Sequence, residues 1–148
     1  FGNPSTNSYR RLIPGYEAPI SATFAKASRN AAVRIPGYLA KQDVRMEYRT
    51  GDASANIHYM LAAMLLAGCD GILRKLDPVK LGFNDVENDE NRRFPLDLHS
   101  VMDGLEKDHQ YLAPVFPQEL LSRWTTVKRA EADYVYNAPI PQEYELYF

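Results

Sequence analysis

The feature that most constrains this fold is an apolar segment between residues 57 and 76 with the spacing of a helix. Its large apolar side chains recur about every 3.6 residues, at Ile57, Met60, Leu61, Met64, Leu65 and Ile72. Almost nothing polar interrupts residues 60–67. Because a helix that is apolar on most sides is a buried one, we predict a central helix. It begins at Asp52 or Ser54 and ends near Leu76, before Asp77 and Pro78.

Three stretches before this helix have the alternating pattern of β-strands. They are residues 19–27, 30–36 and 43–49. In the third stretch, Val44, Met46 and Tyr48 alternate with charged residues. Side chains alternate between the two faces of a strand, so Glu47 and Arg49 are expected on the same face. That charged face is either solvated, above a buried apolar face, or lines a polar cavity.

The remainder of the chain is predicted to be mainly helical. Residues 98–112 have an amphipathic pattern, and a further helix begins at Pro117 and reaches Tyr136. An acidic loop occupies residues 82–95, and a tail with two prolines follows residue 137. Strands followed by helices in this order indicate one α+β domain.

The composition is that of a globular protein with one core, since 45% of the residues are hydrophobic and 24% are charged. No stretch approaches the roughly 20 uncharged apolar residues of a membrane helix, and no leader pattern opens the chain. Because residue 1 is Phe rather than Met, we expect a processed or truncated product. The single cysteine, Cys69, favours a reducing compartment, so a cytoplasmic location is expected.

Charge is distributed unevenly along the chain. The net charge of −2 argues against non-specific nucleic-acid binding. Residues 1–49 carry eight basic and three acidic side chains, a net charge of +5, and the rest carries −7. Six of the eight basic residues are arginine, the side chain suited to a two-pronged grip on carboxylate or phosphate. The first third of the chain is therefore either a solvated basic face or an anion site.

Isolated reactive side chains are interpreted as structural. The sequence contains no GxxxxGK[ST], GxGxxG or HExxH motif. His58 lies on the apolar helix and Cys69 has no cationic neighbour, so both are expected to pack in the core. His99 and His109 have no carboxylate or cysteine at metal-ligand spacing and are expected on helix surfaces.

An ordered set of motifs spans nearly the whole chain. It comprises NSYRRLIPGYEAP at 7–19, Arg29, RIP at 34–36, RMEYR at 45–49, Asp52, Asn56, AGCDGI at 67–72 and EYELYF at 143–148. In order and spacing this set resembles the C-terminal part of the catalytic domain of bacterial and archaeal glutamine synthetases, with the weakest match at 78–97. The resemblance implies an α+β fold in which antiparallel strands form part of a half-barrel and helices pack outside. Residues 1–50 would hold active-site loops and strands, and residues 54–148 would be mainly helical.

The resemblance implies ATP-dependent ligation of ammonia to the γ-carboxylate of L-glutamate, giving glutamine. ATP phosphorylates that carboxylate, and ammonia then displaces phosphate from γ-glutamyl phosphate. Phosphoryl transfer depends on positioning and on neutralising spread negative charge, which arginines and Mg²⁺ or Mn²⁺ supply. The implied partners are L-glutamate, ATP, ammonium and further copies of the enzyme in a ring-shaped homo-oligomer, a dodecamer. No nucleic acid or membrane is implied.

The resemblance also implies roles for three residues at the glutamate and ammonia side. Arg11 matches an arginine that holds the glutamate substrate. Glu17 matches a catalytic glutamate on a flap that closes over the substrate and takes a proton from bound ammonium. Arg29 matches a catalytic arginine that contacts both the transferring phosphate of ATP and the glutamate.

Three further residues are matched at the ATP side. Arg34 matches an arginine that binds the phosphates of ATP, and Arg49 matches one on the glutamate and γ-phosphate side. Glu47 matches the carboxylate that binds the ATP-side metal, since Mg²⁺ and Mn²⁺ prefer oxygen ligands. The family often has an ATP-contacting lysine at the position of Gln42, whereas here the lysine is Lys41, so both are left out of the predicted site.

The resemblance has a limit, because the family's enzyme is much longer and most of its metal ligands lie upstream of the matched part. Glu47 is the one ligand that is matched here, so the 148 residues alone are expected to be inactive. Two alternatives remain open. One is a ligase of the same family that joins glutamate to another amine. The other is a non-catalytic glutamine synthetase-like protein with a structural or regulatory role.

Overall fold

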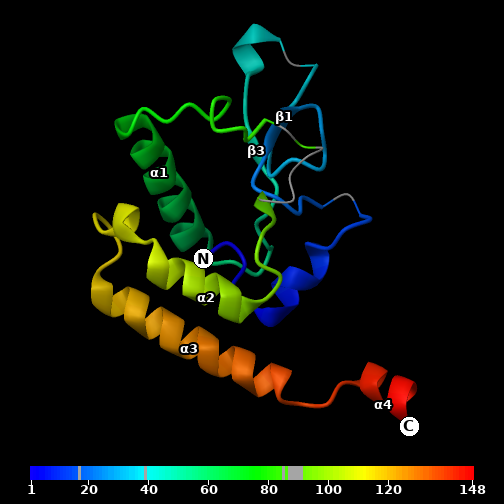
Figure 1. Ribbon diagram of the computed structural model, residues 1–148. Helices are drawn as coiled ribbons and strands as arrows, with labels where there is room; N and C mark the ends of the chain where they lie inside the picture. The colour runs from blue at the N-terminus through cyan, green and yellow to red at the C-terminus, as the bar shows by residue number, and fades with distance from the viewer. Residues whose placement is uncertain (17, 39, 85, 87–91) are drawn as a thin grey trace.

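The computed structural model describes residues 1–148 except 17, 39, 85 and 87–91. Helices follow a small sheet in chain order, which confirms the predicted α+β class (Figure 1). The elements, with η for 3₁₀ helices, are η1 Thr6–Arg11, β1 Phe24–Lys26, β2 Val33–Ile35, η2 Lys41–Asp43, β3 Glu47–Tyr48, α1 Ile57–Leu73, α2 Leu98–Lys107, η4 Gln110–Leu112, α3 Gln118–Tyr136 and α4 Pro141–Tyr147.

The described strands form a sheet in the order β1-β2-β3, and each strand is shorter than its predicted stretch. Strands β2 and β3 pair antiparallel, as expected, with Arg34 directly opposite Glu47. Strands β1 and β2 pair parallel, so the expectation of antiparallel strands is wrong for this pair. Ala27 has a φ of 63°, a left-handed turn straight after β1. Because the strands are so short, the connection 27–32 can return the chain to the start of β2.

Local capping explains where the helices begin. The side chain of Asn56 accepts hydrogen bonds from the backbone N–H groups of His58 at 3.0 Å and Tyr59 at 3.3 Å. Helix α1 therefore begins after Asn56 rather than at Asp52 or Ser54. Asp97 caps α2 in the same way by accepting from the backbone N–H of Ser100 at 2.8 Å.

Helices α2 and α3 lie side by side (Figure 1), and polar contacts join them. Arg129 of α3 donates to Asp103 at 2.6 Å and to Glu106 at 2.8 Å. His99 Nε2 lies 3.0 Å from Asp133 Oδ1, so this histidine is a link between two helices.

Among the described residues, two small apolar clusters form where α2 and α3 meet their neighbours. The first contains Tyr9, Leu98, Met102 and Ala132, and therefore ties η1 to both helices. The second contains Leu112, Phe116 and Leu121, with a stripe of α1 packed against it, namely Tyr59, Ala62, Ala63 and Leu66. Both clusters lie on the helical side of the molecule rather than under the sheet.

The prediction that α1 is buried is wrong. None of its seventeen residues is buried, and Leu65 and Ile72 are 69% and 77% exposed. One stripe of the helix packs against the second cluster, and Met60 lies close to Gly2 and Gly51, while Leu65 and Ile72 on other faces remain exposed. His58 and Cys69 are also exposed, which corrects their expected place in the core. In the described part of the chain, no helix combines the length and apolar character needed to span a membrane.

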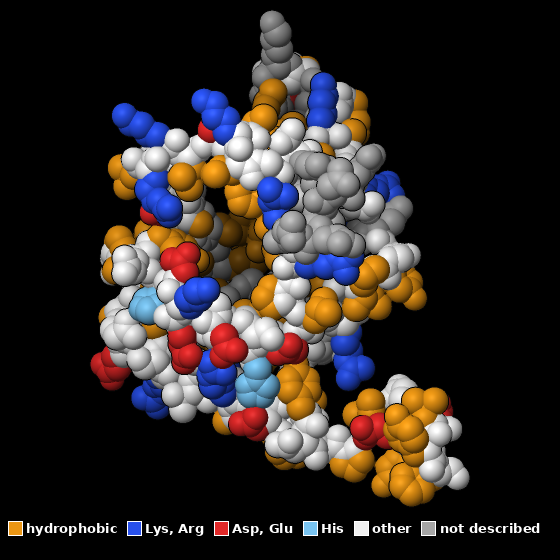
Figure 2. All heavy atoms as spheres, viewed as in Figure 1, with side chains coloured by type: hydrophobic (Ala, Val, Ile, Leu, Met, Phe, Trp, Pro, Cys, Tyr) orange, Lys and Arg blue, Asp and Glu red, His pale blue; other side chains and the backbone are white. Residues whose placement is uncertain are grey.

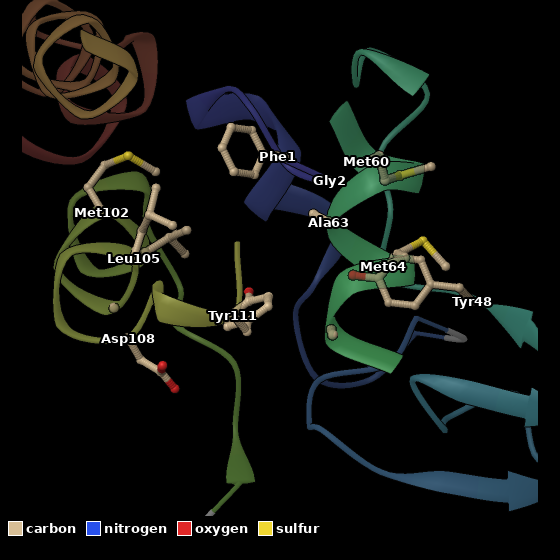
Figure 3. A pocket seen from close by; sticks show the side chains of 13 residues that line it. Phe1, Gly2, Tyr48, Met60, Ala63, Met64, Met102, Leu105, Asp108 and Tyr111 are labelled. Carbon is tan, nitrogen blue, oxygen red and sulfur yellow. The ribbon is translucent and has the colours of Figure 1, made fainter. Parts of the chain in front are cut away.

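A cavity of about 370 Å³ separates part of α1 from α2. Figure 3 shows Met60 and Met64 of α1 on one side and Met102 and Leu105 of α2 on the other, with Phe1 between them. Helix α1 is therefore separated from α2 along part of its length by this cavity, and Met60 also lies close to Gly51.

Candidate active site

The predicted site residues that the structure describes come from the end of η1, from β2 and β3 and from adjoining loops. Five of the six are described, namely Arg11, Arg29, Arg34, Glu47 and Arg49, and Glu17 lies outside the described residues. On the face shown in Figure 2, basic side chains project around the sheet and acidic side chains gather over α2 and α3. Basic side chains also lie among the acidic ones over α2 and α3 on this face.

Strand pairing brings Arg34 and Glu47 together. The two residues are directly opposite each other in the β2–β3 ladder, and Arg34 Nη1 donates to Glu47 Oε2 at 2.8 Å. Their side chains are 15% and 29% exposed, so the pair is partly shielded from water. The hydrogen bond to Glu47 raises the pKa of the Arg34 guanidinium above its ordinary value.

Hydrogen bonds to backbone carbonyls draw the other three arginines together. Arg11 Nη2 donates to the carbonyl oxygens of Arg49 at 2.9 Å and Gly51 at 3.2 Å. Arg49 Nε donates to the carbonyl oxygen of Arg29 at 3.0 Å. The segment at residue 11 is therefore bound to the segment at residue 49, which is bound in turn to the segment at residue 29. These bonds connect the backbone segments that carry the three residues, and their assignment to one site stays a prediction.

A surface recess lies beside Arg11. It has a volume of about 460 Å³ and is lined by Arg10, Arg11, Ile13, Tyr16 and Ala18. Two guanidinium groups at its wall suit a small molecule with a carboxylate. Asp52 lies near this wall, and the backbone N–H of Ser54 donates to its carboxylate at 2.9 Å. This hydrogen bond, with a smaller electrostatic contribution from Arg11, lowers the pKa of Asp52.

Glu47 has two arginines as neighbours. Besides Arg34 at Oε2, Arg45 Nη2 lies 3.6 Å from Oε1. The sequence prediction left Arg45 out of the site, although the alternation of residues 43–49 would place it on the face of Glu47. The alternating pattern of the strand could therefore have identified Arg45 as a neighbour of Glu47.

The arrangement at Glu47 does not fit a metal ion held by the described residues alone. Both carboxylate oxygens face guanidinium groups, which repel a cation. No group of three or more Asp, Glu, His or Cys side chains lies together in the described part of the chain, whereas Mg²⁺ and Ca²⁺ sites use several oxygen ligands. The assignment of Glu47 as a metal ligand therefore stays a prediction.

Comparisons with known proteins agree with the resemblance. The model of the family described as "Glutamine synthetase, catalytic domain" matches residues 1–147. Glutamine synthetase of Mycolicibacterium smegmatis is 41% identical over 159 residues, covering 100% of this chain and 33% of that protein. Glutamine synthetase of Sulfolobus acidocaldarius is 39% identical over 150 residues, which cover 95% of this chain and 32% of that protein.

A solved structure supports the fold. The cryo-EM structure of Plasmodium falciparum glutamine synthetase superposes with a TM-score of 0.85 at 24% identity, covering 100% of this chain and 38% of that chain. The chain spans about a third of the length of the curated relatives it matches.

Proposed function

The chain belongs to the glutamine synthetase family, and from this premise we propose that it takes part in the ATP-dependent ligation of ammonia to the γ-carboxylate of L-glutamate. The observation that carries the proposal is the arginine network around β2 and β3. Hydrogen bonds join Arg11 to Arg49 and Arg49 to Arg29, while Arg34 lies on the neighbouring strand. These are residue types that phosphoryl transfer to a carboxylate requires.

The proposed reaction proceeds in two steps. An oxygen of the γ-carboxylate attacks the γ-phosphorus of ATP, and ADP leaves. The lone pair of ammonia then attacks the γ-carbon, and phosphate leaves with that oxygen. Negative charge builds on the transferring phosphate in the first step, so positioned guanidinium groups lower its barrier.

We assign the arginines by the family residues that they match, and their contacts support this assignment. Arg11, at the wall of the recess, holds a carboxylate of glutamate. Arg29 and Arg49, joined by the hydrogen bond of Arg49 to the Arg29 carbonyl, lie at the meeting point of glutamate and the γ-phosphate. Arg34 binds the phosphates of ATP.

Two carboxylate side chains complete the proposed active site. Glu17 takes the proton that ammonium must lose before nitrogen can attack. Glu47 is proposed as one ligand of Mg²⁺ or Mn²⁺, with the other ligands outside the described cluster. A bound divalent ion would supply charge neutralisation at the phosphates.

We also propose that these residues work within a homo-oligomer, in a ring such as a dodecamer. The exposed apolar faces of α1, which include Leu65 and Ile72, support an interface of this kind. The exposed thiol of Cys69 supports a cytoplasmic location, because free thiols persist where the compartment is reducing. In this scheme residues 1–50 carry the active-site loops and strands, and residues 54–148 are the mainly helical support.

Formation of γ-glutamyl hydroxamate from glutamate, ATP and hydroxylamine tests the proposed function. The complete gene product should form the hydroxamate in the presence of Mg²⁺, whereas the 148 residues alone should not, because Glu47 needs further ligands. Absence of hydroxamate from the folded complete product would contradict the proposed reaction. Hydroxamate formed by the 148 residues alone would contradict the need for other parts of the site.

A further inference from the structure

Asp52 belongs to the motif set in the sequence but has no assigned role in the proposed site. It follows Gly51 in the loop between β3 and α1 and is half-buried. Its backbone N–H donates to the carbonyl oxygen of Gly2 at 2.8 Å, and its carbonyl oxygen accepts from the backbone N–H of Ala55 at 3.1 Å. Its carboxylate accepts from the backbone N–H of Ser54 at 2.9 Å. Asp52 therefore ties the loop to the N-terminal segment and to the turn before α1.

Arg11 donates to two carbonyl oxygens of the segment just before Asp52. The acceptors belong to Arg49 at 2.9 Å and Gly51 at 3.2 Å, and both bonds come from Nη2 of Arg11. A guanidinium has five N–H donors, so three remain for a ligand in the recess. The direction in which Arg11 presents these donors therefore depends on where the loop places its carbonyl oxygens.

Close packing restrains the same loop at Gly51. A Cβ atom at this position would lie 2.9 Å from Met60 Sδ and 3.5 Å from Tyr48 Cε1. The first distance is shorter than a favourable contact between carbon atoms, so the glycine backbone lies directly against α1. Packing at Gly51 and hydrogen bonds at Asp52 together hold the segment to which Arg11 donates.

Asp52 also interacts with the helix that carries Arg11. Hydrogen bonding from the Ser54 backbone, with smaller contributions from the Ser8 side chain and from the charge of Arg11, lowers the pKa of Asp52. Ser8 and Arg11 both belong to η1. The ionised carboxylate therefore has partners on the loop and on η1, and it can hold these two segments in a fixed relation.

We propose that Asp52 is a positioning residue for Arg11 and so sets the affinity of the recess for a carboxylate of glutamate. This role rests on the proposed function, since it concerns how the glutamate subsite is built. Asp52 itself does not touch the substrate. It holds the carbonyl oxygens of Arg49 and Gly51 in place, and these in turn hold the guanidinium of Arg11.

Asp97 provides a matched comparison in the same chain. Its carboxylate accepts from the backbone N–H of Ser100 at 2.8 Å, much as that of Asp52 accepts from Ser54. Asp97 caps α2, however, and no residue that lines the recess belongs to α2. Loss of Asp97 should therefore cost stability without changing the affinity for glutamate.

Steady-state kinetics of hydroxamate formation by the complete gene product test this role. The variants are D52A, D52N, R11A, the double variant R11A/D52A and the control D97A, and each is first shown by circular dichroism to be folded. D52E is the second variant, should D52A not fold, because its longer side chain keeps the charge but moves the acceptor away from the Ser54 N–H. The KM for glutamate and the KM for ATP are measured separately, since a general loss of structure would not change one of them alone.

Removal of the acceptor should weaken glutamate binding selectively. We expect D52A or D52E to raise the KM for glutamate about fivefold, the effect of about one hydrogen bond, while the KM for ATP changes by less than about twofold. D52N keeps an oxygen that can accept from the Ser54 N–H and should stay within about twofold of the wild type for both substrates. D97A should change neither KM. Because Asp52 acts through Arg11, R11A/D52A should have a KM for glutamate within about twofold of that of R11A alone.

Three results would overturn the positioning role. An unchanged KM for glutamate in D52A would mean that the loop does not position Arg11. A further fivefold rise from R11A to R11A/D52A would show that Asp52 acts independently of Arg11. Equal effects of D52N and D52A would assign the effect to the charge rather than to the hydrogen bond. Each of these results requires a wild type that forms hydroxamate, whereas failure of the proposed function would leave the wild type itself without product.

Discussion

Replacing Met102 with alanine tests where the stability of this chain originates. Met102 is 2% exposed and lies in the first core cluster, in which α2 is packed against η1 and α3. Met46 is the matched control, because it is the same residue type in the same chain but is 74% exposed.

The two substitutions should differ by several kilocalories per mole. Replacing a buried Met by Ala removes its apolar contacts and leaves a cavity, which costs about 2–5 kcal/mol. The exposed Met46→Ala should stay within about 0.5 kcal/mol. With a urea m-value of about 2 kcal/mol/M, a loss of about 3 kcal/mol lowers the unfolding midpoint by about 1.5 M.

Urea unfolding followed by far-ultraviolet circular dichroism measures both midpoints. We expect the midpoint of Met102→Ala to fall well below that of the wild type and that of Met46→Ala to remain close to it, with equal m-values. The reasoning fails if the two variants lose similar stability, because the core would then not lie between α2, α3 and η1.

Three further predictions concern a helix cap and two site residues. Asp97→Ala should cost about 1 kcal/mol at neutral pH by removing the cap of α2. The hydrogen bond from the Ser100 backbone lowers the pKa of Asp97 below 3.8, so this stability is present above about pH 4 and lost as pH falls through the lowered pKa. Urea unfolding should therefore find that the difference between wild type and variant shrinks as the pH falls below about 4, and a difference that does not change with pH would argue against the charged cap. In the complete gene product, Glu47→Ala should abolish hydroxamate formation, and near-normal turnover at low Mg²⁺ would exclude Glu47 as a metal ligand. Arg11→Ala there should raise the KM for glutamate about tenfold or more while changing the KM for ATP little, and equal changes in both would contradict its place at the glutamate recess.

The sequence predicted the elements that depend on local chemistry. Helix α1 follows from apolar spacing, although its cap is Asn56 rather than Asp52 or Ser54, and α3 follows from Pro117 at its start. The tail helix α4 had a similar local signal in Pro141 at its first position. The site residues were predicted by the resemblance to a family, since periodicity alone could not distinguish an anion site from a solvated basic face.

What the sequence did not predict depends on contacts between distant segments. The parallel pairing of β1 and β2 depends on the left-handed turn at Ala27, and alanine carries no signal for such a turn. Burial of α1 depends on what packs against it, which apolar spacing does not specify. The opposition of Arg34 and Glu47 depends on strand register, and short strands specify register weakly.

We propose that these residues belong to an enzyme that activates the γ-carboxylate of glutamate by phosphorylation. The most direct measurement follows oxygen from that carboxylate. The complete gene product is supplied with glutamate labelled with ¹⁸O in the γ-carboxylate, ATP, Mg²⁺ and ammonium, and the phosphate released is analysed by mass spectrometry. The proposed reaction predicts one ¹⁸O atom in each phosphate molecule released, because the carboxylate oxygen that attacks ATP leaves with the phosphate. Release of phosphate without ¹⁸O while glutamine forms would contradict phosphorylation of the carboxylate.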